Sequence, residues 1–208
     1  MLLQFLSNFV YIILLLPSCY LLGSVMSAIF VARLFSLPDP RLYGSKNPGA
    51  TNIARSQHIT ATVLTFLGDG CKGFIPVKCA VLLGYSNYAG LFLGFATVIG
   101  HMFPIFFNYR GGKGMATAFG VTLALSFPIT MLNTCVWLFV YWISRISGLA
   151  SVVSVCVLPA LYLASPTHYS LAPYVAVFSI LIVWMHGHNL FNIFQSFFGK
   201  TPSKHYYN

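Results

Sequence analysis

Long apolar runs separated by short polar stretches make up most of the chain. The first run covers residues 5–31 and contains no charged side chain, because Arg33 is the first charged residue. Six further apolar segments follow, at residues 73–85, 88–107, 115–126, 129–144, 150–163 and 171–185. A straight membrane-spanning helix needs about 20 apolar residues, so the pattern predicts an all-α, polytopic integral membrane protein with seven transmembrane helices. The two shortest segments, 73–85 and 115–126, either extend at their ends, or the second pairs with its successor in one helix kinked at Pro128.

Composition supports this class of protein. Of the 208 residues, 58% are hydrophobic and only 6% are charged, whereas a soluble domain contains about 25% charged residues. So few charges cannot cover a soluble surface, and a chain this apolar is not disordered. The length predicts a single membrane-embedded domain over residues 1–208.

The distribution of Lys and Arg predicts the orientation in the membrane. If the N-terminus lies outside, the inside loops are residues 33–72, 108–114, 145–149 and 186–208, and they hold ten of the eleven basic residues. The eleventh, Lys78, lies near the inner end of its expected helix and can reach the interface. Cytoplasmic loops are enriched in Lys and Arg, so we expect the C-terminus in the cytoplasm. The first run lacks a basic n-region, which predicts an uncleaved first helix.

The net charge of +9 comes from basic residues scattered between apolar segments. This placement favours topology signals and an anion site over a nucleic-acid surface. The five cysteines are widely spaced without a C-x-x-C pair, which predicts neither a disulfide framework nor a metal site. We therefore expect no nucleic-acid partner, no metal and no cofactor.

The longest polar stretch, residues 40–55, lies in the first inside loop. Asn47 followed by Pro48 is typical of a helix start, with an N-cap residue and then proline at the first helical position. A helix N-terminus offers free N–H groups to an anion. The candidate groups are the N–H groups of Gly49, Ala50 and Thr51, the Ser45 hydroxyl and the Arg55 guanidinium. The alternative is an ordinary capped helix within a loop.

A second polar cluster runs from His101 to residue 120. Gly111, Gly112 and Gly114 surround Lys113 and open an expected helix, so the backbone can approach a ligand to which the lysine adds a positive charge. The stretch is not a Walker A loop, because the required spacing and the final hydroxyl residue are absent. The alternative is a tight turn with a lysine that serves only as a topology signal.

Smaller polar features complete the pattern. His186 and Asn189 are three residues apart and share one helix face, whereas His186 and His188 diverge, which argues against a metal site. Asp69 and Lys72 are expected to form a local ion pair at the mouth of a helix. The polar groups at residues 40–55, 100–120 and 186–192 lie on the same predicted membrane face. Their cationic side chains favour a ligand with a phosphate group and an apolar tail; they are Arg41, Lys46, Arg55, Arg110, Lys113 and His186. The chain has no carboxylate pair for hydrolytic acid/base chemistry.

These motifs resemble those of the acyl-phosphate-dependent glycerol-3-phosphate acyltransferases of bacterial membranes. The matching stretches are residues 44–52 with Arg55, 100–106 with 111–120, Asp69-x-x-Lys72-Gly73 and His186-x-x-Asn189-Leu. The resemblance covers about residues 20–195. It implies transfer of a fatty acyl group from acyl phosphate to the 1-hydroxyl of sn-glycerol 3-phosphate, which gives lysophosphatidic acid and phosphate. It also implies seven helices in the bacterial inner membrane, a cytoplasmic active site, and functional coupling to the enzyme that produces acyl phosphate.

The resemblance also implies roles for individual residues. The implied catalytic residues are Ser45, Arg55, Lys113, His186 and Asn189. The implied substrate-binding residues are Asn47, Gly49, Thr51, Asn52, His101, Gly111, Gly112, Gly114 and Ser151. Lys46 adds a charge beside this site, so we also expect it to bind substrate. The chain departs from the family at Lys46, where glycine is expected, and at Asn192, where arginine is common. The acyl-CoA-using enzymes have an H-x-x-x-x-D pair that this chain lacks, which favours acyl phosphate as the donor.

Two other classes of function remain open from the sequence. A transporter for a phosphorylated metabolite predicts charges within spans and inverted repeats, and neither is evident. A non-catalytic lipid-binding membrane subunit explains the basic face, but it does not explain the glycines around Lys113.

Overall fold

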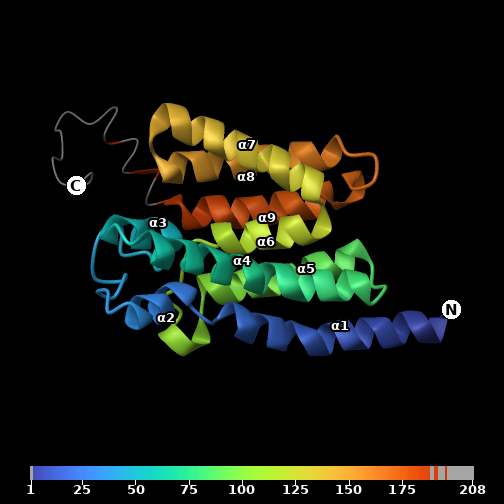
Figure 1. The fold of residues 1–208 in the computed structure, drawn as a ribbon. Helices are drawn as coiled ribbons and strands as arrows, with labels where there is room; N and C mark the ends of the chain where they lie inside the picture. The colour runs from blue at the N-terminus through green and yellow to red at the C-terminus, as the bar shows by residue number, and fades with distance from the viewer. Residues whose placement is uncertain (1, 188–189, 192–194, 196–208) are drawn as a thin grey trace. The chain divides into compact units, whose positions relative to one another are not determined.

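The computed structural model describes residues 2–187, 190–191 and 195, and these residues contain helices and loops but no strand. The all-α class is therefore confirmed for this part of the chain (Figure 1). The chain divides into two compact units, residues 1–130 and 131–208. A single domain over residues 1–208 stays a prediction.

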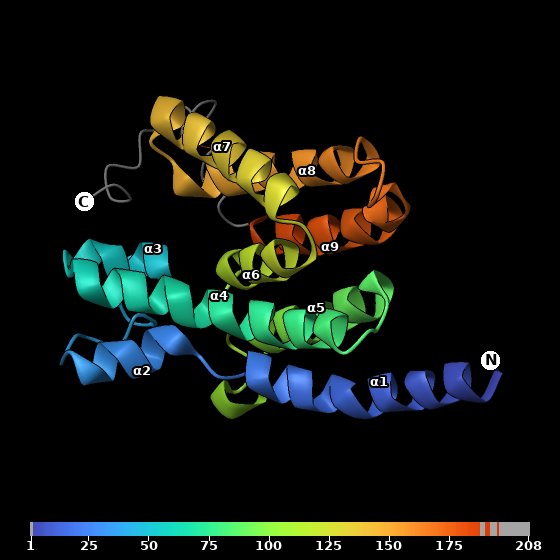
Figure 2. The same cartoon turned by 45° about the vertical axis from the view of Figure 1, so that its right-hand side comes forward.

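The first unit is a layered helical bundle. Its helices are α1 (Leu2–Gly23), α2 (Ser27–Leu34), α3 (Ala50–Ile53), α4 (Ile59–Leu82), α5 (Asn87–Met102) and α6 (Met115–Leu125), with short 3-10 turns η1 (Ala54–Ser56) and η2 (Ile105–Phe107). Helices α4 and α5 form a middle layer, with α1 and α2 on one side and α6 on the other (Figure 2). Where α2, α3 and α4 meet, a small apolar core contains the buried residues Ala28, Ala32, Ile53 and Ala61.

Glycines allow the helices of this unit to pack backbone against backbone. A Cβ atom at Gly100 of α5 would overlap the carbonyl of Tyr20 in α1. A Cβ atom at Gly120 of α6 would likewise overlap the carbonyl of Gly70 in α4. Small residues at such crossings are common in membrane helices, where close van der Waals packing replaces the hydrophobic effect. The crossings fix α6, and hence the loop that precedes it, against α4.

The second unit contains most of α7 (Phe127–Ser144), together with α8 (Ser147–Leu163), η3 (Tyr169–Leu171) and α9 (Ala172–Met185). Helices α8 and α9 pack along each other. Their shared core contains the buried side chains of Val155, Leu158, Tyr162, Val175, Phe178 and Ile182.

Two expected helices differ from the structure. The run 5–31 is divided into α1 and α2 by a break at residues 24–26. The segment 73–85 belongs to α4, which begins at Ile59 and has 24 residues. The polar residues of 59–72 had indicated a loop, but Asp69 and Lys72 pair with each other inside the helix. Lys72 is therefore not a loop residue, and Lys78 lies near the C-terminal end of α4 rather than near its start.

The remaining expected segments agree with the structure more closely. Segment 88–107 corresponds to α5 with η2, and segments 150–163 and 171–185 correspond to α8 and α9. Segments 115–126 and 129–144 are separate helices, because Ser126 is extended with φ −154° and ends α6. Pro128 lies in the first turn of α7, where proline is tolerated, so the alternative of one helix kinked at Pro128 is wrong.

Three segments of the described chain are long and apolar enough to cross a membrane: Ile12–Leu34, Asn87–Phe107 and Phe127–Ser144. Shorter apolar helices occupy Met115–Leu125, Ser147–Leu163 and Tyr169–Met185. Helix α4 is about 36 Å long at 1.5 Å per residue, which is sufficient to cross the hydrocarbon core. The count of seven spans and their orientation stay predictions.

Candidate active site

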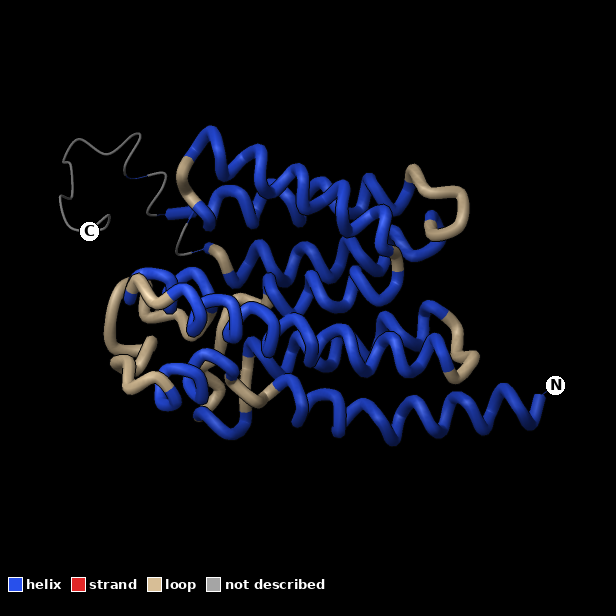
Figure 3. The backbone as a smooth tube through the Cα atoms, viewed as in Figure 1, coloured by secondary structure: helices blue, strands red, loops and turns tan. Residues whose placement is uncertain are grey.

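The polar loops of the first unit gather at one end of the bundle. The tube view shows the loop of residues 35–49 and the loop of residues 103–114 at the same end of the unit as the start of α4, with the short α4–α5 turn at the opposite end (Figure 3). This arrangement follows from the up-and-down course of α4, α5 and α6. It brings the first two sequence motifs to the same end.

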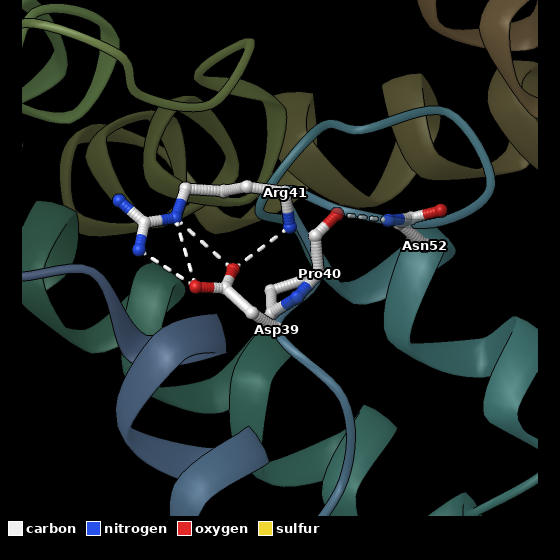
Figure 4. A network of polar contacts seen from close by, with 4 residues as sticks. All are labelled: Asp39, Pro40, Arg41 and Asn52. Atoms are coloured by element: carbon white, nitrogen blue, oxygen red, sulfur yellow. Dashed lines mark hydrogen bonds and ion pairs between the residues drawn. The ribbon is translucent and has the colours of Figure 1, made fainter.

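Asn52 holds the first of these loops in shape. Its side chain is 1% exposed, and its Nδ2 group donates to the carbonyls of Pro40 at 2.7 Å and Tyr43 at 3.2 Å. Its Oδ1 atom accepts the N–H of Ser45 at 3.0 Å. Figure 4 shows the amide turned toward the Pro40 carbonyl. Because all three contacts are with the backbone, Asn52 organises the loop, and its expected role in substrate binding stays a prediction.

Ser45 follows Gly44 in the chain, and the Arg55 side chain approaches Gly44 in space. The backbone of Gly44 is left-handed with φ +55°, and a Cβ atom there would approach Arg55 Nη1 to 2.8 Å and Cδ to 2.9 Å. The arginine therefore runs directly past the glycine. Ser45 and Arg55 are both exposed, so both side chains are open to a ligand. The sequence did not single out this structural role of Gly44, although the position of Gly44 inside a matching motif was a usable signal.

Lys46, next to Ser45, is also left-handed, with φ +56°. Glycine adopts this region without steric cost, whereas a residue with a Cβ atom does not. The family's expected glycine at this position therefore has a conformational reason. The Lys46 side chain is exposed.

The helix start expected at Asn47 and Pro48 is wrong by two residues. Gly49 is the N-cap residue and α3 begins at Ala50. The N–H of Gly49 donates to the Asn47 carbonyl at 2.9 Å, so a tight turn precedes the helix. Because α3 has only four residues, it makes a weak anion site on its own. The expected binding roles of Asn47, Gly49 and Thr51 stay predictions.

Arg41 forms an ion pair with Asp39. Its Nε and Nη2 atoms donate to both carboxylate oxygens of Asp39, the shortest contact being 2.6 Å (Figure 4). The guanidinium also lies 5.8 Å from the centre of the Phe107 ring, a cation–π distance. Hydrogen bonding and the charge of Arg41 lower the pKa of Asp39. Arg41 thus ties the first loop to the second and leaves the phosphate-binding role to other cations.

Lys113 lies at the start of α6, as the glycine pattern predicted. Gly114 is the N-cap residue with φ +83°, and α6 begins at Met115. Burial lowers the pKa of Lys113 to about 8, and the nearby positive charge of Arg55 contributes to this. The two cations from different motifs therefore interact electrostatically. Whether Lys113 binds substrate or serves only as a topology signal stays a prediction.

Gly111 and Gly112 pack against His101. The N–H of Gly112 donates to the His101 carbonyl at 3.0 Å. A Cβ atom at Gly111 would overlap that carbonyl, and a Cβ atom at Gly112 would overlap the His101 ring. The His101 side chain is 3% exposed, so it lies on the buried side of the glycine loop rather than on its solvent side. The expected substrate contacts of these residues stay predictions.

The second unit contains two of the expected site residues. The Ser151 hydroxyl accepts the indole N–H of Trp137 at 3.1 Å. His186 is buried at the end of α9, and its Nδ1 atom lies 2.8 Å from the Ile182 carbonyl. Because a carbonyl only accepts, Nδ1 carries a proton in this contact. Asn189 and Asn192 lie outside the described residues.

In the first unit Arg55 interacts electrostatically with Lys113, and it passes close to Gly44, the residue before Ser45. Arg55 and Lys113 supply positive charge, and Ser45 supplies a hydrogen-bond donor. Such a set stabilises phosphate and the negative charge that develops during acyl transfer. Over the described chain, no three His, Cys, Asp or Glu side chains are grouped to hold a metal ion.

Comparisons with known proteins agree with this chemistry. The family model described as glycerol-3-phosphate acyltransferase matches residues 13–196. Proteins named glycerol-3-phosphate acyltransferase are similar to this chain in Hydrogenovibrio crunogenus (41% identity over 84% of this chain and 84% of that protein) and in Pseudomonas fluorescens (43% identity over 84% of this chain and 92% of that protein). A crystal structure of PlsY (YgiH), an integral membrane glycerol 3-phosphate acyltransferase in its glycerol 3-phosphate form, is also similar. Its TM-score is 0.83 at 34% identity, over 89% of this chain and 93% of that chain.

Proposed function

The chain belongs to the glycerol-3-phosphate acyltransferase family, and from this premise we propose that it acylates the 1-hydroxyl of sn-glycerol 3-phosphate with acyl phosphate as the donor. The products are lysophosphatidic acid and phosphate. The similar PlsY protein has been crystallised in a glycerol 3-phosphate form and in a lysophosphatidic acid form, which supports these compounds as substrate and product.

The observation that carries the proposal is the placement of Lys113 directly before the left-handed N-cap Gly114 of α6, where the positive charge of Arg55 also acts on it. The two substrates are phosphate-bearing anions that repel each other, so a protein that joins them must neutralise both. Two cations next to an exposed Ser45 hydroxyl supply this neutralisation and orient the phosphates. Ser45 acts as a hydrogen-bond donor to phosphate rather than as a nucleophile.

The chemical step requires little more from the protein, because an acyl phosphate is already activated. The 1-hydroxyl oxygen attacks the acyl carbon, and the new ester C–O bond forms. The bond between the acyl carbon and the phosphate oxygen breaks, and its electron pair leaves with the phosphate. The hydroxyl proton passes to a phosphate oxygen of the substrate. The family resemblance offers His186 as the alternative acceptor.

The membrane arrangement forms part of the proposal. The chain crosses the bacterial inner membrane seven times as one domain, with its N-terminus outside and its C-terminus in the cytoplasm. The loops with Ser45 and Lys113 then face the cytoplasm, where the enzyme that produces acyl phosphate supplies the donor. The basic residues of the loops at 33–58 and 108–114 support this orientation.

A turnover assay on the purified protein tests the proposal. Palmitoyl phosphate and glycerol 3-phosphate should give lysophosphatidic acid and phosphate in equal amounts, whereas palmitoyl-CoA should give little product. Glycerol in place of glycerol 3-phosphate is the control for the phosphate requirement. Equal or faster turnover with palmitoyl-CoA would contradict the choice of donor, and no turnover with either donor would contradict the function.

A further inference from the structure

Three buried polar side chains behind the glycine loop have no part in the chemical step described above. Asp69 and Lys72 come from α4 and His101 comes from the last turn of α5, with exposed fractions of 1%, 5% and 3%. Burying an ion costs several kcal/mol, and apolar side chains of similar volume often stabilise a helix contact as well as a buried ion pair does. The presence of charge here therefore points to a purpose beyond packing.

The charged pair connects α4 to a break in the helix before it. Lys72 Nζ lies 3.0 Å from Asp69 Oδ1. The same ammonium donates at 2.7 Å to the carbonyl of Val25, which lies in the break between α1 and α2. Lys72 thus fixes where the Asp69 carboxylate points.

His101 lies between this carboxylate and the glycine loop. Its Nδ1 atom is 3.6 Å from Asp69 Oδ1, and its Nε2 side faces Gly112 so closely that only a glycine fits there. Its carbonyl accepts the Gly112 N–H. The backbone that leads into Lys113 therefore packs directly on His101, and the Asp69 carboxylate lies within ion-pair distance of the ring on its Nδ1 side.

We propose that Asp69, Lys72 and His101 form a positioning unit that sets the backbone of Gly111 and Gly112 and thereby places the Lys113 ammonium beside Arg55. This proposal rests on the proposed function, because it assumes that Lys113 binds substrate phosphate. The three side chains are positioning residues that act through the loop. His101 then acts on the loop rather than on the substrate.

A double-mutant cycle between His101 and Lys113 tests the positioning unit. His101→Gln should lower kcat/KM for glycerol 3-phosphate by about 10- to 100-fold, since a misplacement of about 1 Å costs this much. In a Lys113→Met background the same change should cost less than about threefold, because the group that His101 positions is already gone. The effects on Tm should add in the two backgrounds. Equal kinetic losses in both backgrounds would overturn the proposal.

A second variant covers the case in which His101→Gln does not fold. Asp69→Asn combined with Lys72→Met removes both buried charges together, which proteins tolerate better than removal of one. The loss in kcat/KM that this double change causes should likewise become small in the Lys113→Met background. The matched control is Ser86→Ala, which removes the N-cap at the far end of α5 and should lower Tm without changing kcat/KM. A kinetic loss in Ser86→Ala as large as in His101→Gln would show that activity follows stability alone, and would overturn the proposal.

The rise in Tm on adding glycerol 3-phosphate separates this proposal from the proposed function. If the wild type is active but the kinetic losses of the His101 and Lys113 substitutions add, only the positioning unit is wrong. If the wild type forms no lysophosphatidic acid, the proposed function is wrong. The double-mutant cycle is then measured as the rise in Tm that glycerol 3-phosphate causes in each variant. A wild type with neither turnover nor a rise in Tm contradicts both.

Discussion

Burial and the nearby positive charge of Arg55 together lower the pKa of Lys113 to about 8. The two residues come from different loops, which meet at one end of the first unit. An anionic ligand that contacts both side chains would offset this repulsion. The relationship is the physical reason for proposing a phosphate site.

The pH dependence of the reaction should report Lys113. As pH rises through about 8, Lys113 loses its proton and its attraction for phosphate, so kcat/KM should fall. Glycerol 3-phosphate itself does not change charge in this range, since the second phosphate pKa is about 6. The measurement is a kcat/KM profile from pH 6.5 to 9.5, and a flat profile would contradict the assignment.

Lys113→Arg is the control for this profile. An arginine stays protonated throughout this range, so the fall above pH 8 should disappear. The larger guanidinium fits the loop less well, and overall efficiency should be lower by a modest factor. If the fall persists in the arginine variant, another group causes it.

Asn52→Ala should destabilise the first loop. The change leaves the Pro40 carbonyl and the Ser45 N–H without their amide partner, and a buried polar group left unsatisfied costs about 1–3 kcal/mol. The Tm in detergent should fall by several degrees. Thr51→Ala, an exposed change in the same short helix, is the control and should leave Tm nearly unchanged. Equal Tm values for both variants would show that Asn52 does not hold the loop.

Lys46→Gly should be at least as stable as the wild type. A residue with a Cβ atom loses about 1–2 kcal/mol in the left-handed conformation that Lys46 adopts, and glycine removes that cost. Lys46→Val should lower Tm, because a β-branched residue tolerates φ +56° least. Thermal unfolding of the three proteins checks the order. A valine variant as stable as the glycine variant would be inconsistent with the backbone conformation at this position.

Cysteine labelling tests the proposed orientation. Single cysteines at Ser86 and Tyr109, both exposed, are introduced on a background without native cysteines. An impermeant reagent applied to intact cells should label position 86 only, because position 109 is expected in the cytoplasm. Labelling at position 109 alone would reverse the orientation.

The sequence predicted the helices that are uniformly apolar. The segments at 150–163 and 171–185 lie within a few residues of α8 and α9, because an apolar run has no competing interpretation. Helix α4 was placed 14 residues too late, since Asp69 and Lys72 look like loop residues when taken singly. Their ion pair is confirmed, but it lies inside α4 rather than at the mouth of a helix.

The residue types of the candidate site were predictable from the sequence, but the directions of its side chains were not. The motifs contain Ser45, Arg55 and Lys113, yet nothing in the pattern indicates that Asn52 turns its amide to the backbone. The ion pair of Arg41 with Asp39 follows from their neighbouring positions in a turn. That contact was therefore predictable from the sequence. The stacking of His101 behind Gly112 depends on packing between segments and was not.

Replacing Lys113 tests the phosphate site most directly. Removing one partner of a desolvated charge pair costs about 2–5 kcal/mol, which is about a 30- to 5000-fold loss in kcat/KM. Lys113→Met keeps most of the bulk, so the variant should remain monodisperse in detergent. Arg110→Met removes an equal charge from an exposed position of the same loop and should change kcat/KM by less than about threefold.

The decisive measurement is kcat/KM for glycerol 3-phosphate in Lys113→Met beside Arg110→Met, with palmitoyl phosphate as donor. We predict a loss of at least about 30-fold in the first variant and near wild-type efficiency in the second. Wild-type efficiency in Lys113→Met would remove Lys113 from the site and leave it as a topology signal only.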